Sequence, residues 1–224
     1  MEEQNHIKSF CIRGGRISAA QQRCYTLLKD SFCLPLCDAQ ADYEKIFNNK
    51  NPVTIEIGFG AGLATAIIAK ENPNNNYIGI EVFKAGIGKL LWRIEKDGLQ
   101  NIRIIEGDAV TAIANMIQNN SINAFHIFFP DPWPKKRHCK RRLVQRPFTE
   151  LLAAKLALNG YIYFVTDWSD YADYALGELS ATSKIKNCYA DFAVPQAWRP
   201  ETRFEKKGKI SGHEIKELMF KKIN

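Results

Sequence analysis

The sequence lacks the features of membrane and secreted proteins. No stretch approaches the roughly 18 apolar residues of a membrane-spanning helix, and the start of the chain lacks the basic and then apolar layout of a signal peptide. The 6 cysteines follow no regular spacing, which indicates reduced thiols and no disulfide framework. These absences predict a cytoplasmic protein that does not contact a membrane.

Metal-binding patterns are missing as well. Cys33 and Cys37 could begin a metal site, but no second Cys or His pair with ligand spacing accompanies them. We therefore expect structural thiols and no bound metal. The chain also contains no internal repeat and no low-complexity tract.

What is present is apolar and basic. The chain has 224 residues, of which 46% are hydrophobic, and this is enough to bury the core of one α/β domain. The formal net charge of +7 favours a polyanionic partner, although many basic proteins bind no nucleic acid. Where the charge lies is therefore more informative than its total.

From residue 51 to 224, strands alternate with helices. Strands rich in Val, Ile and Phe between amphipathic helices predict an α/β fold with a mostly parallel sheet and helices on both faces. Two further strands are expected near 188–194 and 213–222, and the helix over 146–160 is expected to end at a glycine cap. The remaining expected strands cover 52–58, 76–82, 101–109, 124–131 and 161–167, and the remaining helices cover 63–72, 85–98, 110–118 and 170–181.

Residues 1–50 differ from the rest and predict an N-terminal arm that leans on this domain. Ser18 is expected to cap one helix, and Asp38 is expected to cap another over 38–47. The basic residues of the arm are equally compatible with RNA contact and with an ordinary solvated surface; they are Lys8, Arg13, Arg16 and Arg23.

Acidic residues stand at the ends of successive predicted strands. In an open parallel sheet, ligands bind outside the carboxyl ends of the strands. One acid there would mean little, but several in the same place predict a functional site. These acids are Glu56, Glu81, Asp108, Asp131 and Asp167.

A glycine-rich turn follows the first of these strands. The stretch "EIGFGAG" places glycines at Gly58, Gly60 and Gly62, which permit tight turning and close approach of a ligand to the backbone. A dinucleotide site of the G-x-G-x-x-G type would need its third glycine at position 63, where this chain has Leu63. Such a turn is a weak signal by itself, because it also occurs at simple strand-to-helix connections.

The neighbouring acids favour S-adenosylmethionine over NAD as the cofactor. Glu56 would repel a pyrophosphate but could pair with a cationic amino-acid portion. Glu81 stands where an acid holds ribose hydroxyls. Asp108 could accept the adenine amino group, although of the three it is the one best explained as a helix cap alone.

Asp131 is the candidate catalytic residue. A fixed carboxylate beside the methyl group can stabilise the positive charge that moves onto the acceptor. The following Trp133 could stack on a base, but packing within a loop made rigid by Pro132 and Pro134 explains it slightly better.

A basic block follows at once. A run of charge is usually a solvated face, but beside a methyl-transfer edge this block predicts contact with the phosphates of a large nucleic acid. Its cations are Lys135, Lys136, Arg137, Lys140, Arg141 and Arg142.

Six stretches, in order along the chain, together resemble one known family, the TrmB family of tRNA (guanine-N(7)-)-methyltransferases. They are "VTIEIGFGAG", "YIGIEV", "EGDA", "FFPDPWPKKRHCKRRL", "FVTDW" and "WRPETRFEKKG". The fourth and the last are far more specific than the glycine turn. The resemblance implies a class I (Rossmann-like) S-adenosylmethionine-dependent methyltransferase fold, a cytosolic tRNA substrate and methylation of a guanine in the variable loop.

The resemblance also implies residue roles. It assigns the cofactor to Glu56, Glu81, Asp108 and Asp131, and RNA contact to the loop 137–142. Arg203 stands where the family commonly has Lys, which keeps the charge but changes the geometry. The implied substrate contacts are Lys135, Asp167, Thr202, Arg203, Phe204 and Glu205.

Two other functions remain open from the residues alone. One is a methyltransferase that acts on an exocyclic base amine, for which "DPW" is the best support, although Trp133 stands where that motif usually has a second proline. The other is a non-catalytic RNA-binding partner with the same fold. The sequence is equally compatible with a monomer and a homodimer.

Overall fold

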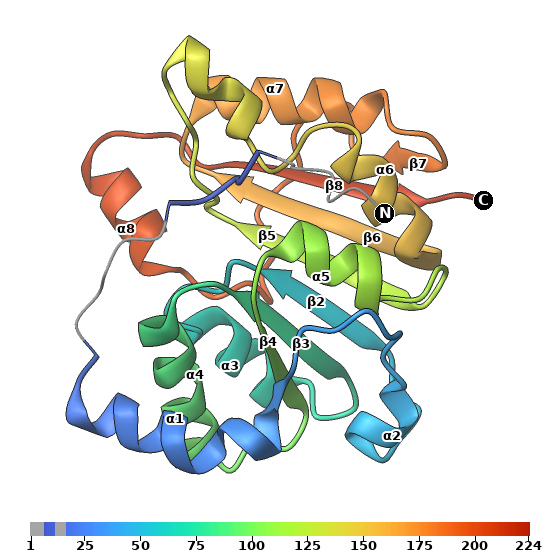
Figure 1. Ribbon diagram of the computed structural model, residues 1–224. Coiled ribbons are helices and arrows are strands. Elements are labelled where there is room, and N and C mark those ends of the chain that lie inside the picture. Colours follow the sequence, from blue (N-terminus) through green and yellow to red (C-terminus); the bar gives the residue numbers. More distant parts are fainter. Residues whose placement is uncertain (1–6, 12–16) are drawn as a thin grey trace.

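Among the residues that the computed structural model describes, 7–11 and 17–224, eight strands form one sheet in the order β1-β4-β3-β2-β5-β6-β8-β7 (Figure 1). Strands β1 to β6 run parallel to one another, while β8 is antiparallel to both β6 and β7. The strands are β1 (Cys33–Leu34), β2 (Val53–Ile57), β3 (Asn76–Glu81), β4 (Ile102–Glu106), β5 (Ile122–Phe128), β6 (Leu156–Thr166), β7 (Ile185–Asn187) and β8 (Lys216–Lys222).

Helices cover both faces of this sheet. Figure 1 shows α1, α3 and α4 together at the lower left, while α5, α6 and α7 lie on the other side. The helices are α1 (Ala19–Phe32), α2 (Tyr43–Phe47), α3 (Leu63–Glu71), α4 (Lys84–Asp97), α5 (Ala109–Met116), α6 (Phe148–Lys155), α7 (Ser169–Ser180) and α8 (Arg203–Ile210), with the 3-10 helix η1 (Lys136–Arg141).

The core consists of two apolar clusters, one on each face. Successive side chains of a strand point to opposite faces, so Ile105 joins the cluster under α5 and α6 while Ile104 joins the cluster under α1 and α4. Burial of strands on both faces explains why they read as nearly continuous apolar runs.

The predicted alternation of strands and helices is confirmed, and Ser18 caps α1 through the amide of Gln21. The prediction that Asp38 caps the next helix is wrong. Asp42 is the cap of α2, whereas Asp38 accepts a hydrogen bond from the Asn115 side chain.

Two predictions near the last strands are also wrong. The helix expected over 146–160 ends at Lys155, because Leu156 pairs with Ile122 and already belongs to β6. Gly160 therefore lies within a strand, where an added Cβ would come 2.8 Å from the Ile122 carbonyl oxygen. No strand forms over 188–194; the edge strand is β7, immediately before it.

The chain order of the strands reverses at β2. Its neighbours are β3 on one side and β5 on the other, and such a reversal opens a crevice outside the carboxyl ends of the strands. The arrowheads of β5 and β6 point to the left of Figure 1, so this edge of the sheet, which we call the carboxyl edge, faces left.

Candidate active site

The glycine turn after β2 begins the candidate site. Gly58, Gly60 and Gly62 all have positive φ angles, of 73°, 57° and 66°, which glycine adopts at no steric cost. A Cβ added at Gly58 or Gly60 would meet nothing within 4 Å, whereas one at Gly62 would come 2.7 Å from the Cβ of Leu90. The first two glycines therefore border open space on the side where a ligand would approach.

Helix α4 fixes the turn from behind. A Cβ added at Gly86 would lie 2.2 Å from the carbonyl oxygen of Gly60. Only glycine fits this contact without displacing the backbone of the turn.

Glu56 is a buried acid beside the turn. Its carboxylate accepts a hydrogen bond of 2.7 Å from the Thr65 hydroxyl. Burial raises the pKa of Glu56 to about 7. The hydrogen bond from Thr65 opposes this rise, and the nearby charge of Glu81 adds to it. Glu56 therefore favours a cation in its neighbourhood, because a cation would stabilise the ionised form.

Glu81 holds the turn through backbone amides. It accepts hydrogen bonds from Gly60, Val82 and Phe83, at 2.8, 2.7 and 3.0 Å. Burial raises the pKa of Glu81, the amides oppose that shift, and the charge of Asp131 raises it further. Glu81 ends β3 and Asp131 follows the end of β5, so both lie at the carboxyl edge although they are far apart in the chain.

Asp108 is a helix cap, as its neighbourhood in sequence suggested. Its Oδ2 accepts hydrogen bonds of 3.0 Å from both the amide and the hydroxyl of Thr111 at the start of α5. It stands directly beyond the end of β4, the neighbour of β3. This capping role leaves a cofactor contact of Asp108 as a prediction.

The loop that carries Asp131 has a constrained backbone. Phe129 and Trp133 have φ angles of 51° and 46°, a region that side-chain-bearing residues rarely adopt. The amide of Phe129 donates to the Val165 carbonyl of β6 at 2.8 Å. Such conformations persist only where surrounding contacts impose them, so the loop presents Asp131 in a defined position past β5.

Trp133 packs within the protein. Its indole N–H donates to the Ser9 carbonyl at 2.9 Å, and the guanidinium of Arg141 lies 4.4 Å from its ring centroid. Arg141 also donates to the Lys8 carbonyl. The N-terminal segment is thereby attached to the basic block.

Most of the basic block is accessible, and one member is not. Lys135, Lys136, Arg137 and Lys140 are exposed around η1. Arg142 is only 2% exposed: its guanidinium pairs with Asp170, and its Nε donates to the Pro132 carbonyl. Its burial and these two contacts favour a structural role for Arg142 over the predicted RNA contact.

Helix α8 brings the segment 202–205 to the same edge. Thr202 caps the helix by accepting the Glu205 amide, while Arg203 and Phe204 are exposed. A Cβ added at Gly208 would lie 2.9 Å from a carboxylate oxygen of Asp167, which follows β6. The segment 202–205, although distant in sequence from the other site residues, therefore lies at the carboxyl edge.

Glu205 itself faces inward. Its carboxylate is buried against Arg199. The Arg199 guanidinium forms ion pairs with Glu205, at 2.5 Å, and with Glu217 of β8, at 2.6 Å. The hydroxyl of Tyr163 donates to Glu217. We call these four residues the Arg199 cluster. The sequence did not predict this cluster, because ion pairs between distant segments leave no periodic pattern. The one signal was Arg199 itself, which stands between Trp198 and Pro200 in "WRPETRFE".

The predicted basic residues of the arm differ in their surroundings. Arg23 pairs with Glu95 of α4, which accounts for its charge without RNA. Lys8 is exposed beside the basic block. Arg13 and Arg16 lie outside the described residues.

The part of the chain that the structure describes lacks two features. No helix there is long and apolar enough to cross a membrane. No group of three or more His, Cys, Asp or Glu side chains there is arranged to hold a metal ion.

Comparison with solved structures identifies the fold. The protein matches the 16S rRNA methyltransferase KamB with a TM-score of 0.61 at 15% identity, over 83% of this chain and 95% of that one. It matches the aminoglycoside resistance methyltransferase NpmB1 with a TM-score of 0.55 at 13% identity, over 80% and 93%. At these identities the likeness establishes a methyltransferase fold and nothing about the substrate.

Sequence comparison identifies the family. Residues 50–218 match the family model Methyltransf_4, described as "Putative methyltransferase". The tRNA (guanine-N(7)-)-methyltransferase of Neisseria meningitidis serogroup B (strain ATCC BAA-335 / MC58) is 45% identical over 97% of this chain and 91% of that protein. The enzyme of the same name from Burkholderia pseudomallei (strain K96243) is 45% identical over 96% and 82%. The fold, the strand-end acids and these matches agree, and the chain belongs to the TrmB family of tRNA (guanine-N(7)-)-methyltransferases.

Proposed function

We propose that the protein transfers a methyl group from S-adenosylmethionine to N(7) of a guanine in the variable loop of tRNA. One observation carries the proposal: the chain is 45% identical, over 97% of its length, to a protein named tRNA (guanine-N(7)-)-methyltransferase. The geometry agrees, because Asp131 follows β5 at the carboxyl edge and an exposed basic block comes directly after it.

The residues present fit this cofactor. Gly58 and Gly60 border open space, and Glu56 would gain a favourable partner from the α-ammonium group of the methionine portion. Glu81 would exchange part of its amide contacts for ribose hydroxyls, with Asp108 next along the edge toward adenine. When bound, S-adenosylmethionine supplies an electrophilic methyl group on a positively charged sulfur.

Guanine N(7) is a suitable acceptor for a site without a strong base. This nitrogen carries an accessible lone pair and no proton at neutral pH. Methyl transfer moves a positive charge onto the guanine, and the fixed carboxylate of Asp131 stabilises that charge as it develops. Alignment of the base against the methyl group provides the remainder of the rate enhancement.

The substrate contacts divide into two groups. Lys135, Arg203 and Phe204 are exposed and reach the tRNA directly, with Lys136, Arg137, Lys140 and Arg141 on its phosphates. Asp167, Thr202 and Glu205 act mainly by positioning α8, since each already has a partner within the protein.

The arm over residues 1–50 adds to the RNA surface in this proposal. Its segment 7–11 touches the basic block through Ser9 and Lys8, so Lys8 extends the cationic surface of the domain over 51–224. The cytoplasmic location and the choice between monomer and homodimer stay predictions.

Incubation of unmodified tRNA with methyl-labelled S-adenosylmethionine, followed by digestion to nucleosides, tests the proposal. We expect labelled N(7)-methylguanosine and no other labelled nucleoside. A labelled base with a methylated exocyclic amine would instead identify an amine methyltransferase. Retention of tRNA without any transfer would identify a non-catalytic binding protein.

A further inference from the structure

We propose that helix α4 is a second docking surface for the tRNA backbone, separate from the basic block. The surface consists of Lys89, Arg93 and Lys96, which we call the α4 stripe. This inference rests on the proposed function, because it takes the bound polyanion to be the tRNA substrate.

The three cations share one side of the helix. They are spaced by four and then three residues, and residues three and four apart are neighbours on a helix surface. Lys89 and Lys96 are exposed, and Arg93 is partly exposed. The stripe therefore presents a row of positive charge to solvent.

The acids of α4 do not neutralise this row. Glu95 pairs with Arg23 of α1, and Asp97 pairs with Lys70 of α3. Among the described residues, no ion pair joins Lys89, Arg93 or Lys96 to an acid. Cations of neighbouring helices thus occupy the acids of α4 and leave its own cations available.

Trp92 helps to hold two of the cations in place. Its ring centroid lies 5.9 Å from the Arg93 guanidinium carbon and 5.1 Å from the Lys96 ammonium nitrogen, within the range of cation–π attraction. Like charges four residues apart destabilise a helix by about 0.2–0.5 kcal/mol. Repulsion within the stripe therefore lowers the stability of α4 slightly. A bound anion would offset this repulsion.

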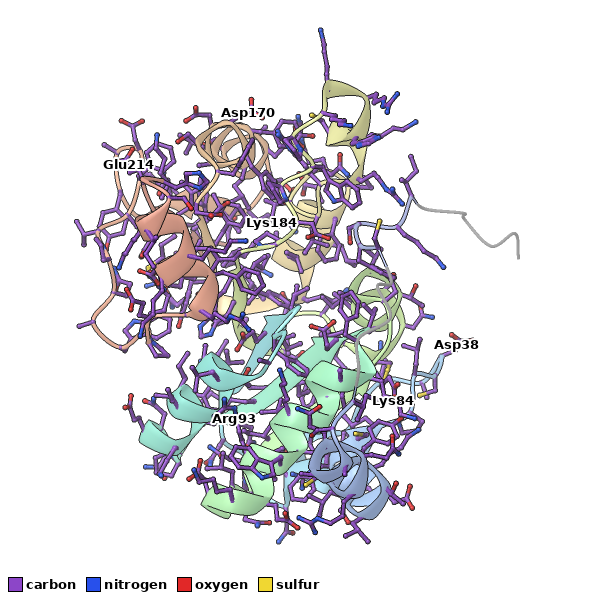
Figure 2. The ribbon with its side chains drawn as sticks, turned by 90° about the vertical axis from the view of Figure 1, so that its left-hand side faces the viewer. Asp38, Lys84, Arg93, Asp170, Lys184 and Glu214 are labelled. Atoms are coloured by element: carbon purple, nitrogen blue, oxygen red, sulfur yellow. The ribbon has the colours of Figure 1, made fainter. Side chains whose placement is uncertain are left out.

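The stripe lies near the cofactor turn and on the same side of the molecule as the other basic elements. The Nε of Arg93 donates to the Ala61 carbonyl in the glycine turn at 3.4 Å. Figure 1 places α4 and α8 on its left side, and Figure 2, viewed from that side, labels Arg93 and Lys84 on α4. Lys84 is exposed nearer the start of the helix. One extended polyanion can therefore touch the basic block, α8 and α4 together, which favours RNA over a small acidic protein.

The test removes the two lysines of the stripe and leaves Arg93 and its contact with the glycine turn. In the double variant Lys89→Gln/Lys96→Gln, we expect the KM for full-length tRNA to rise about tenfold at about 0.1 M salt, with kcat within about twofold of wild type. The slope of log Kd for tRNA against log salt concentration should fall by about two, one for each lost phosphate contact.

The matched control is Lys45→Gln/Lys186→Gln, which removes the same charge from exposed positions on α2 and β7. Its KM and salt slope should equal those of wild type. A wild-type salt slope and KM in the α4 double variant would overturn the inference, as would equal losses in both double variants. Failure of the proposed function looks different: the wild-type protein would form no N(7)-methylguanosine, and the salt slopes would still report whether α4 binds RNA.

Discussion

At the scale of single residues, Glu56 shows how the site is prepared for a cation. Its carboxyl group is buried with one hydroxyl donor and with Glu81 nearby, and its pKa rises to about 7. An ordinary Glu would ionise well below neutral pH. The pKa of Glu56 therefore lies close to neutral pH, where a nearby cationic ligand would shift the carboxyl group to its ionised form.

This shift has a consequence for stability. Because the folded-state pKa of Glu56 lies above its unfolded value, the folded state binds the proton more tightly, and stability falls as pH rises from about 4.5 to about 7. We expect Glu56→Gln to match wild type near pH 4.5 and to exceed its unfolding free energy by about 3 kcal/mol above pH 7. Urea unfolding across this range measures the difference. The exposed control Glu71→Gln should follow wild type at every pH. The prediction would be contradicted if the unfolding free energy of Glu56→Gln also changed with pH in parallel with that of wild type.

Asp131 is tested by its effect on turnover. We expect Asp131→Ala to lower kcat by about 100-fold or more, because it removes the carboxylate that stabilises the developing charge, while cofactor affinity mostly survives. Single-turnover methylation and calorimetric titration of S-adenosylmethionine separate these effects. Asp173→Ala, at an exposed acid of α7, serves as the control. Turnover like that of wild type in the Asp131 variant would remove it from the reaction.

At the scale of elements, α4 matters through its close contact with the glycine turn. In Gly86→Ala, the new methyl group would lie 2.2 Å from the Gly60 carbonyl oxygen, so the turn must move. We expect cofactor Kd to rise about tenfold or more even though alanine favours helix by about 1 kcal/mol.

Gly177→Ala in α7 is the matched substitution, because a Cβ there meets nothing within 4 Å. It should stabilise the protein by about 0.5–1 kcal/mol and leave cofactor affinity unchanged. Equal cofactor affinities in the two variants would show that α4 does not hold the turn.

The Arg199 cluster joins α8 to the sheet. In Arg199→Met, Glu205 and Glu217 would remain buried without their shared cation, and we expect the unfolding free energy to fall by about 3–5 kcal/mol. Arg199→Lys should lose less, since it keeps the charge but not both contacts. Thermal unfolding and the Kd for tRNA measure the effect. A triple variant adds Glu205→Gln and Glu217→Gln to Arg199→Met. If it regains stability, the unpaired charge of the two carboxylates caused the loss; if it does not, another cause must apply.

At the scale of the whole molecule, the repeating parts of the fold were predictable. Apolar runs of strand length between amphipathic helices fix β2 to β6 with their helices, because burial on both faces demands that pattern. The short strands β1 and β7 could not be predicted, because they contain too few residues to show a periodic pattern of apolar side chains. The end of α6 was misplaced because residues that favour helix continue from Leu151 through Lys155 into Leu158 of β6.

The site was predictable where position along a strand determines it, and not where contacts between distant segments do. Glu56 and Glu81 follow from their places at strand ends. The sequence shows six cations close together, but it does not show that one of them, Arg142, is buried against Asp170 and the Pro132 carbonyl. Arg199 was missed for the same reason.

The placement of β8 has a consequence for synthesis. This strand lies between β6 and β7 in the sheet, yet the ribosome makes it after all other described elements, and α8 with the Arg199 cluster depends on it through Glu217. The glycine turn and the Asp131 loop are synthesised early, but the Arg199 cluster cannot anchor α8 to the sheet until Glu217 of β8 has emerged from the ribosome.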